Sequence, residues 1–579
     1  MTVWNKSSPL LFCACFWCLW GCLFLNYDRE KTTENTDSLF VNEVVSRPWG
    51  GGTDWIELYA AGSKSVNLAS YSLRDDNSDH QRAGLPDREL KPGEFLVIIA
   101  NDSGSGGGGY SVPFKLGSAD AVTLFKNDAI VDELDWVDGD APQGGSFGRY
   151  PDGTGNPATL IPTPGRPNIL YDSSGPPLDT LYEYGGTSGQ LFEDTSIYAY
   201  ELEFYTPDWQ TQLELNYLNG ELYLPARLTF GNLVIDSIGV RYKGNSSFMR
   251  SRNTPKKPLK FRFDSFKNIS FYGLRYLNFS NCVSDPTFMR EKIAYDIVRQ
   301  YLPAPRTAYA NIYIEGKLLG LYMQIEQVDE IFIGKHFSDN QGDLFKAGDN
   351  GAPMEYLGAD PAGYVEHFEL KTNAAIDDWS GFITFLDKLN NAPAEAFIDS
   401  LGGCLNLDYA IRHIAFNMAV SHFDSYTGSG RNYYLYDDPP SGRFHMLHWD
   451  LNEAFGAYTN SWDVVAVDLV NIPNLDNRPL TRRILENDSL KQVYLAYVAE
   501  FINGPAHPDS VAARADRIKP LINSHVQADS NKLYSYEDFN ANIETDVTIT
   551  SGITGAVIPG IKSFSVNRNA ELQRQLAGY

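Results

Sequence analysis

Cysteine is scarce in the body of this 579-residue chain. Four of the six cysteines lie within the first 22 residues, which leaves only Cys282 and Cys404 for the remainder. Two cysteines so far apart in the sequence cannot form the disulfide framework of a small secreted domain. The N-terminal cysteines lie in an apolar run without a histidine or a second cysteine pair nearby, so a zinc site is excluded there.

Positive charge is also in deficit, with 47 Lys and Arg against 73 Asp and Glu, a formal net charge of −26. A general nucleic-acid-binding protein needs a basic surface, so we expect no nucleic-acid partner. Residues 191–579 also lack a GxGxxG motif and a Walker lysine motif. Any phosphate-binding site must therefore be built in another way.

Long hydrophobic runs are absent except at residues 9–25 (PLLFCACFWCLWGCLFL), which follow Lys6. A basic residue before a short apolar segment is typical of a secretory signal. Residues 19–22 (LWGC) resemble a bacterial lipobox, although Trp20 departs from the usual small or aliphatic residue. A lipoprotein signal, an uncleaved anchor and an ordinary cleaved signal remain open for residues 1–25. All three place the protein outside the cytoplasm, with membrane contact only through the N-terminal lipid or anchor.

Residues 26–38 are polar and predict a tether, and residues 39–168 predict an all-β domain. Short strands such as DWIELYA (54–60) and FLVIIA (95–100) alternate with Gly- and Asp-rich loops. Strands at this spacing favour a β-sandwich. The segment resembles the lamin-tail domain, an immunoglobulin-like module, in its motifs at 41–44, 54–59, 90–97, 146–153 and 163–168.

Residues 169–190 contain SSGPP and GGTSG and predict a linker. Beyond them, strands are followed by a predicted helix at 287–301 and a hairpin that turns at 315–317. A second helix is predicted at 408–423, and residues 485–576 are predicted to be mainly helical. We therefore expect residues 191–579 to form one α+β domain.

The stretch 424–456 predicts a metal site. Residues 432–437 (NYYLYD) form a predicted strand, 438–442 (DPPSG) a turn, and 443–449 (RFHMLHW) the returning strand. An antiparallel hairpin closed on this turn places Asn432 opposite residue 449, so Asn432 and Asp450 meet at its open end. The helix at 408–423 delivers Asp424. Carboxylate and amide oxygens suit a hard cation such as Mg²⁺.

A basic segment at 252–263 (RNTPKKPLKFRF) precedes this region. Strand alternation places Lys260 and Arg262 on one face, and Lys256 joins them if the extended conformation begins earlier. The turn at 243–247 (KGNSS) can present backbone N–H groups to a phosphate. From these residues alone, a solvated basic face is the alternative.

In this order the segments resemble the CotH family of spore-coat-type atypical protein kinases, over residues 191–579. The motifs that carry the resemblance are 243–247 with 256–257, then 289–296, 320–329, 424–426, 432–436 and 449–452. The resemblance implies an α+β atypical protein-kinase-like domain behind the N-terminal sandwich. It also implies transfer of the ATP γ-phosphate to Ser or Thr of a protein substrate, with Mg²⁺ or Mn²⁺.

Carried over by position, the resemblance implies that Asp424 orients the substrate hydroxyl and that Asp450 binds the metal ion. Asn432 would be the second metal ligand. Asn452 stands where the family often has an acid, and its carbonyl oxygen could still bind the metal ion.

The remaining family roles concern the nucleotide. Lys256, or else Lys260, would contact the phosphates. Glu326 would lie near the base, and Arg290 would fix the phosphate-side lysine or an acid.

Three alternatives remain at this stage. The domain could be a degenerate kinase fold that serves as a non-catalytic surface adhesin or scaffold, or a metal-dependent hydrolase that uses the same acids. His422 and His448 flank the acids, and a zinc site competes there with ordinary structural histidines.

Overall fold

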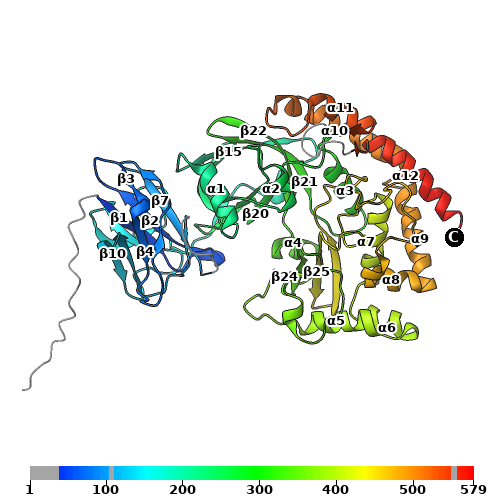
Figure 1. The fold of residues 1–579 in the computed structure, drawn as a ribbon, viewed down its shortest axis with the longest axis horizontal. Helices are drawn as coiled ribbons and strands as arrows, with labels where there is room; N and C mark the ends of the chain where they lie inside the picture. Colours follow the sequence, from blue (N-terminus) through cyan, green and yellow to red (C-terminus); the bar gives the residue numbers. More distant parts are fainter. Residues whose placement is uncertain (1–37, 103–109, 549–556) are drawn as a thin grey trace, which may run out of the picture.

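The computed structural model describes residues 38–102, 110–548 and 557–579. The expected signal, lipid-attachment or anchor segment and most of the tether lie outside the described residues. A small β domain is followed by a larger α+β region (Figure 1). Among the described residues, no helix combines the length and hydropathy that crossing a bilayer requires.

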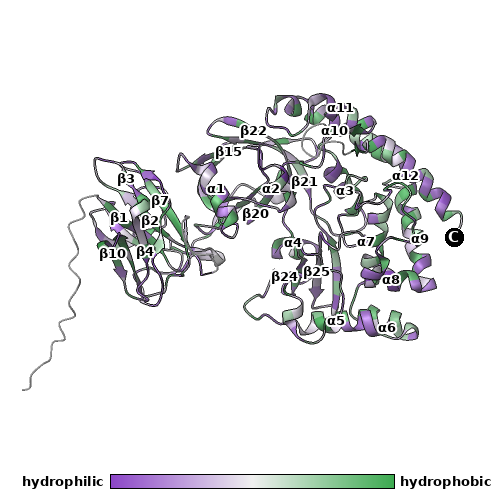
Figure 2. Ribbon diagram, in the orientation of Figure 1, coloured by the Kyte–Doolittle hydropathy of each residue, from purple (hydrophilic) through white to green (hydrophobic). Residues whose placement is uncertain are grey.

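The predicted β-sandwich is confirmed. Its larger sheet consists of β13 (Ile169–Leu170), β12 (Asn156–Ile161), β11 (Ser146–Tyr150), β1 (Leu39–Val45), β2 (Asp54–Ala60), β7 (Phe95–Ala100) and β8 (Ser111–Val112), in that order. The smaller sheet consists of β10 (Ala129–Trp136), β9 (Asp120–Lys126), β4 (Tyr71–Arg74) and β5 (Ala83–Gly84), and β3 (Val66–Asn67) pairs with β6 (Glu89–Leu90). The inner faces bury one apolar core, and β7 is uniformly hydrophobic in Figure 2.

The predicted linker at 169–190 is attached at both ends. Its first two residues form β13 and extend the sandwich sheet, with Leu170 opposite Leu160. Further along, β14 (Tyr182–Tyr184) pairs in parallel with β19 (Ile269–Phe271) of the larger region. Backbone pairing therefore continues from one domain into the other.

The sandwich packs directly on the larger region. Trp55 of β2 is fully buried in a cluster that also contains Leu222 and Phe266. Tyr110 Oη donates a hydrogen bond of 2.7 Å to Asp208. The contact is both apolar and polar, so the sandwich supports the outer side of the next domain.

The larger region begins with a closed β-barrel. Its strands, in spatial order, are β15 (Ile197–Phe204), β16 (Leu224–Phe230), β17 (Leu233–Tyr242), β18 (Leu259–Arg262), β20 (Tyr276–Ser280), β22 (Lys317–Glu326) and β21 (Thr307–Ile314). Phe261 and Phe279 fill the interior, and their rings lie 4.5 Å apart. Because side chains alternate along β18, Lys260 points out of the barrel.

A second sheet lies below the barrel in Figure 1. It consists of β24 (Phe368–Leu370), β23 (Leu344–Ala347), β25 (Tyr433–Asp438) and β26 (Arg443–His448). The short strands β27 (Val547–Thr548) and β28 (Val557–Ile558) pair separately. The four-stranded sheet and the helices around it share one large apolar core.

Helices surround both sheets. They are α1 (Trp209–Leu218), α2 (Ser246–Arg250), α3 (Arg290–Val298), α4 (Glu330–His336), α5 (Ser380–Asn391), α6 (Phe397–Gly402), α7 (Leu407–Ala419), α8 (Pro479–Glu486), α9 (Asp488–Asn503), α10 (Pro508–Ala528), α11 (Tyr536–Glu544) and α12 (Ile561–Leu576). The predicted helical tail is confirmed in α9 to α12. The helix predicted at 287–301 is shorter, because Asp285 accepts the N–H groups of Thr287 and Arg290 and fixes its start.

Candidate functional site

The hairpin predicted around the acids is confirmed. Strands β25 and β26 are antiparallel, with Tyr433 opposite His448. One step further, the Trp449 N–H donates a hydrogen bond of 3.2 Å to the Asn432 carbonyl oxygen. Asn432 and Asp450 therefore leave the hairpin at the same open end.

Asp424 is brought to this end by the turn that follows α7. Asn432 Nδ2 donates to the Asp424 carbonyl oxygen at 2.7 Å and to Asp424 Oδ2 at 3.0 Å. The backbones of Asn432 (φ 60°) and Asp450 (φ 52°) are both in the left-handed region. Aspartate adopts this region only as an exception, and such positions gather at functional sites. Asp424, Asn432 and Asp450 thus form one small cluster, which we call the acid end of the hairpin.

The electrostatics of the acid end are unfavourable without a cation. Burial raises the pKa of Asp450 to about 6, and the negative charges of Asp424 and Glu453 act in the same direction. The positive charge of Lys243 opposes them. Among the described residues, no three His, Cys, Asp or Glu side chains are close enough to hold a metal ion by themselves. A divalent cation here would therefore need further oxygens, as Mg²⁺ usually takes from water and phosphates.

Lys243 follows β17 and faces the acid end. Burial lowers its pKa, while Asp450 and Glu291 are the carboxylates that raise it. Glu291 is on α3, only 3% exposed, and neither of its carboxylate oxygens accepts a hydrogen bond within the described chain. Buried charges without close partners are costly, so a ligand that binds between these groups would stabilise the arrangement.

Lys260 and Lys346 extend the positive charge from Lys243. Burial lowers the pKa of Lys260 well below its usual value, and the positive charges of Arg241, Lys371, Lys243 and Lys346 act in the same direction. Lys346 lies on β23 of the lower sheet, whereas Lys260 lies on the barrel. Within the described residues none of these three lysines forms an ion pair. We call Lys243, Lys260 and Lys346 the lysine group. Because none of them has an ion-pair partner in that part of the chain, the group favours a polyanion between the barrel and the lower sheet.

The structure corrects the expected role of Lys256. Its ammonium group is completely buried and lies 2.6 Å from Asp529 Oδ2, which is also fully buried. The Lys256 ammonium also lies over the ring of Phe288, at 4.7 Å. This lysine joins the barrel to the end of α10 and is not available to phosphates. Lys260 belongs to the lysine group instead.

Arg290 is likewise a structural residue. It is fully buried and donates hydrogen bonds to Asp285 and Asn542 and to the Pro559 carbonyl oxygen. These contacts tie the start of α3 to the C-terminal segment. The neighbouring Glu291 is the residue of this helix that faces the lysine group and Asp450.

The expectation for Glu326 is corrected by strand register. Lys260 is opposite Asn278, and Asn278 is opposite Ile325, so Glu326 points to the other face. There it binds Arg306 at 2.6 Å and Lys335 at 2.9 Å. On the face of Lys260 lies Gln327, whose Oε1 accepts a hydrogen bond of 3.0 Å from Asn278.

Asn452 is half-buried, and sequence reasoning missed the acid that follows it. Glu453 is 5% exposed. Its Oε1 lies 2.8 Å from Arg250 and accepts a hydrogen bond of 2.7 Å from Ser284. Burial and the charge of Asp424 raise the pKa of Glu453. The signal was present in the sequence, as one acid directly after the position where an acid was expected.

The histidines near the acids are buried. His422 and His448 are fully inaccessible, and the ring of His448 stacks on that of His413 at 3.6 Å. Burial lowers the pKa of all three imidazoles. The described residues contain no histidine cluster that could hold a metal ion. The structural interpretation of these histidines therefore fits better than a zinc site.

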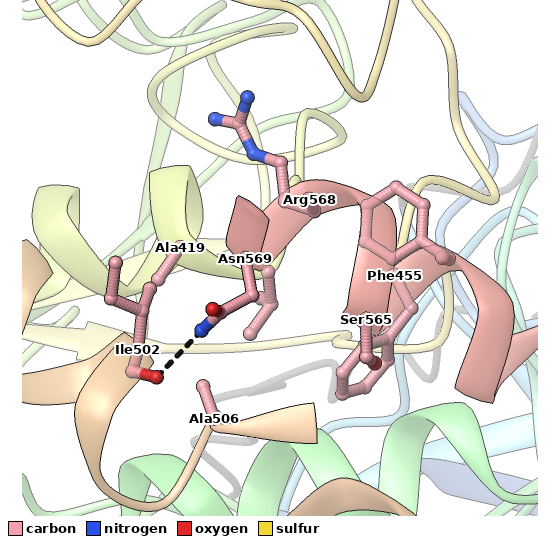
Figure 3. Close-up of a pocket in the computed structure, with 9 residues that line it drawn as sticks. Ala419, Phe455, Ile502, Ala506, Ser565, Arg568 and Asn569 are labelled. Atoms are coloured by element: carbon pink, nitrogen blue, oxygen red, sulfur yellow. Dashed lines mark hydrogen bonds between the residues drawn. The ribbon is translucent and has the colours of Figure 1, made fainter. Parts of the chain in front are cut away.

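Helix α12 supports the loop that carries Asp450. Arg568 donates hydrogen bonds to the carbonyl oxygens of Val465 at 2.6 Å, Val467 at 2.9 Å and Met418 at 2.9 Å. Figure 3 shows the cavity of about 10 Å³ beside it, where Asn569 donates to the Ile502 carbonyl oxygen at 2.7 Å. A cavity of this size holds one water molecule at most. It is a packing feature, and the lysine group and acid end form the candidate site.

Known proteins resemble both parts of the chain. The model of the CotH kinase protein family matches residues 240–568, and that of the lamin tail domain matches residues 32–138. The chain is 24% identical to inner spore coat protein H of Bacillus subtilis (strain 168) over 294 residues, which cover 49% of this chain and 77% of that protein. The matched family region includes all three lysines of the lysine group and the acid end of the hairpin. The chain therefore belongs to the CotH kinase protein family and carries a lamin tail domain ahead of its family region.

Proposed function

We propose that this protein is an atypical protein kinase that transfers the γ-phosphate of ATP to a Ser or Thr hydroxyl of another protein. The observation that supports the proposal most directly is the lysine group opposite the acid end. Three lysines from two separate sheets have no ion pair within the described residues. They face carboxylates whose negative charge is not balanced by nearby cations. A nucleoside triphosphate bound with a divalent cation would place negative charge beside the lysines and positive charge beside the carboxylates.

The donor set fits Mg²⁺ or Mn²⁺. Asp450 supplies a carboxylate, and Asn432 supplies an amide oxygen, because its Nδ2 is committed to Asp424. When bound, the cation neutralises charge on the phosphates and orients them. Oxygen ligands of this kind suit hard cations.

In this proposal the residues of the chain have separate roles. The lysine group holds the phosphates, and Glu291 keeps Lys243 oriented toward them. The oxygen of the substrate hydroxyl forms a bond to the γ-phosphorus while the bond between this phosphorus and ADP breaks. Asp424 accepts the proton that the hydroxyl loses. The Asn432 side chain fixes Asp424 through two hydrogen bonds, so the carboxylate is held in place before the substrate arrives.

The experiment is transfer of label from γ-labelled ATP, with Mg²⁺ or Mn²⁺, to a Ser- and Thr-containing protein acceptor or to the protein itself. Asp424→Asn and Asp450→Asn remove one charge each with little change in shape. Glu395→Gln, at an exposed acid, is the matched control. We expect transfer by the wild type and the control, and a loss of at least about 100-fold in both site variants. No transfer and no nucleotide binding by the wild type would refute the proposal.

A non-catalytic surface adhesin or scaffold is the second candidate, and Asn452 favours it. The family often has an acid at this position, and an amide holds a metal ion less strongly than a carboxylate does. This candidate predicts that the protein binds nucleotide without transferring phosphate, or that it does not bind nucleotide at all. The same assay, combined with a nucleotide-binding measurement, separates the two.

We place the protein outside the cytoplasm, as an envelope lipoprotein or an anchored or secreted protein. The apolar run at residues 9–25 supports this location, and the relative is named as a spore coat protein. Protease treatment of intact cells tests it. An extracytoplasmic protein is degraded without lysis, whereas a cytoplasmic one is protected.

A further inference from the structure

The loop that follows the acid end returns to the segment that carries Asp424. The Phe455 N–H donates a hydrogen bond of 2.8 Å to the Val420 carbonyl oxygen. Ser421 Oγ donates one of 2.6 Å to the Val464 carbonyl oxygen. Phe455 and Val464 are both buried. The loop is therefore fixed at both ends on the residues just before Asp424.

Trp462, near the second of these fixed points, packs on the neighbour of Asp424. Its ring centroid lies 5.0 Å from that of Phe423, at an interplanar angle of 59°. Phe423 is fully buried and immediately precedes Asp424, whereas Trp462 and Asp424 are both half-buried. One part of the indole is thus packed and another part is open to solvent. The open part lies beside the residue next to the proposed catalytic carboxylate.

A tight turn holds this indole in place. The Trp462 N–H donates a hydrogen bond of 2.7 Å to the Thr459 carbonyl oxygen, which closes a four-residue β-turn. Its two central residues, Asn460 (φ 48°) and Ser461 (φ 62°), are both in the left-handed region, as in a type I′ turn. Tyr458 Oη donates to Asn460 Oδ1 at 3.4 Å. The indole is therefore presented by an ordered turn and needs little further ordering to bind a partner.

We propose that Trp462 binds an apolar side chain of the protein substrate, at a position next to the Ser or Thr that receives the phosphate. This inference rests on the proposed function and adds a sequence preference to it. Successive residues of an extended chain are only about 3.3 Å apart. When the acceptor hydroxyl is at Asp424, a flanking side chain can therefore reach a ring that packs on Phe423.

The chemistry of the indole decides which flanking side chain gains from this contact. An apolar side chain and the open part of the ring both lose contact with water when they meet, which favours binding. A polar side chain at the same position loses hydrogen bonds to water and finds an apolar surface. Tryptophan is also the residue type that most often dominates the binding energy of a protein interface. We therefore expect Leu beside the acceptor to be preferred over Asn.

The test compares two acceptor peptides that contain a single Ser and differ only in its two neighbours, which are Leu in one peptide and Asn in the other. With the purified full chain, Mg²⁺ and labelled ATP, we expect kcat/KM of the wild type to be at least about tenfold higher for the Leu peptide. Trp462→Ala should lose this preference through a higher KM for the Leu peptide, with KM for ATP unchanged. Trp49→Ala, at a half-buried tryptophan of the lamin tail domain, should keep it.

A charge at the same position gives a readout that a structural defect cannot produce. Trp462→Glu should make a peptide with Lys in place of Leu the better substrate, because the new carboxylate attracts the ammonium group. If Trp462 served only to hold the loop, both of its variants would lower kcat/KM for all three peptides in equal proportion.

The outcomes separate this inference from the proposed function. Equal use of the Leu and Asn peptides by the wild type would overturn the inference and leave the kinase proposal intact. The same holds for an unchanged preference in Trp462→Ala, or in Trp462→Glu when the alanine variant does not fold. If the wild type transfers no phosphate, fluorescence anisotropy compares binding of the labelled peptides. Tighter binding of the Leu peptide that is lost in Trp462→Ala would then support this inference while the kinase proposal fails, and equal binding would overturn both.

Discussion

The buried pair of Lys256 and Asp529 provides the sharpest test of how the basic segment is used. Both side chains are fully inaccessible, and their charged atoms are 2.6 Å apart. Asp529 also accepts the backbone N–H groups of Leu321 at 3.0 Å and Asn531 at 2.9 Å. Replacing Asp529 by Asn leaves the Lys256 ammonium group buried without its counter-charge.

The expected cost follows from this burial. Removing one partner of a buried ion pair destabilises a protein by about 3–5 kcal/mol. Lys256→Met should cost less than Asp529→Asn, because Asp529 keeps two backbone donors. The double variant Lys256→Met/Asp529→Asn should recover much of the loss, since neither charge is then left unpaired.

The measurement is thermal unfolding of the full chain together with binding of a fluorescent ATP analogue. We expect the melting temperature of Asp529→Asn to fall by about 5–10 °C, with nucleotide affinity of the folded protein retained. Lys260→Met is the matched control. It removes a half-buried lysine that has other positive charges around it, so it should weaken nucleotide binding with little loss of stability. A Lys256→Met variant with wild-type stability and no nucleotide binding would refute the structural role and restore Lys256 as the phosphate ligand.

The other predictions concern three separate parts of the molecule. Lys243→Met should weaken ATP binding at least about tenfold, whereas Lys64→Met, at an exposed lysine of the lamin tail domain, should leave it unchanged, as isothermal titration calorimetry would show. In that domain, burial raises the pKa of Glu43 to about 7 and that of Glu57 in the same direction, so the folded state holds their protons more tightly than the unfolded state. The free energy of unfolding should therefore fall by on the order of 3 kcal/mol as the pH rises from about 4.5 to 7, and a flat urea midpoint over this range would contradict it. Arg568→Met should lower the melting temperature and speed proteolysis of the loop 456–470, while Arg574→Met on the same helix, 72% exposed, should change neither.

The sequence predicted the elements of the site better than the residues that face it. The hairpin of β25 and β26 was predictable because its aromatic strands and its DPPSG turn are local signals, and its register follows from the turn. The same holds for the β21–β22 hairpin, whose turn residues Glu315 and Gly316 both have positive φ.

The errors are mostly displacements by one residue. Arg290 was expected where Glu291 faces the site. In the same way, Glu326 and Asn452 were predicted, whereas their neighbours Gln327 and Glu453 face it. A shift of one residue moves a strand side chain to the opposite face, so motif position alone cannot decide between neighbours. The tertiary partners decide, and they lie far away in the sequence, as Asp529 does for Lys256.

The contacts of Arg568 have a consequence for how the protein is made. Synthesis runs from the N-terminus, so the lamin tail domain, the lysine group and all the acids are complete before α12 exists. Until Arg568 reaches the Val465, Val467 and Met418 carbonyl oxygens, the loop after Asp450 lacks these three hydrogen bonds. A growing chain could thus carry every functional side chain and still lack a formed site. The proposed activity would then be delayed until α12 has been synthesised.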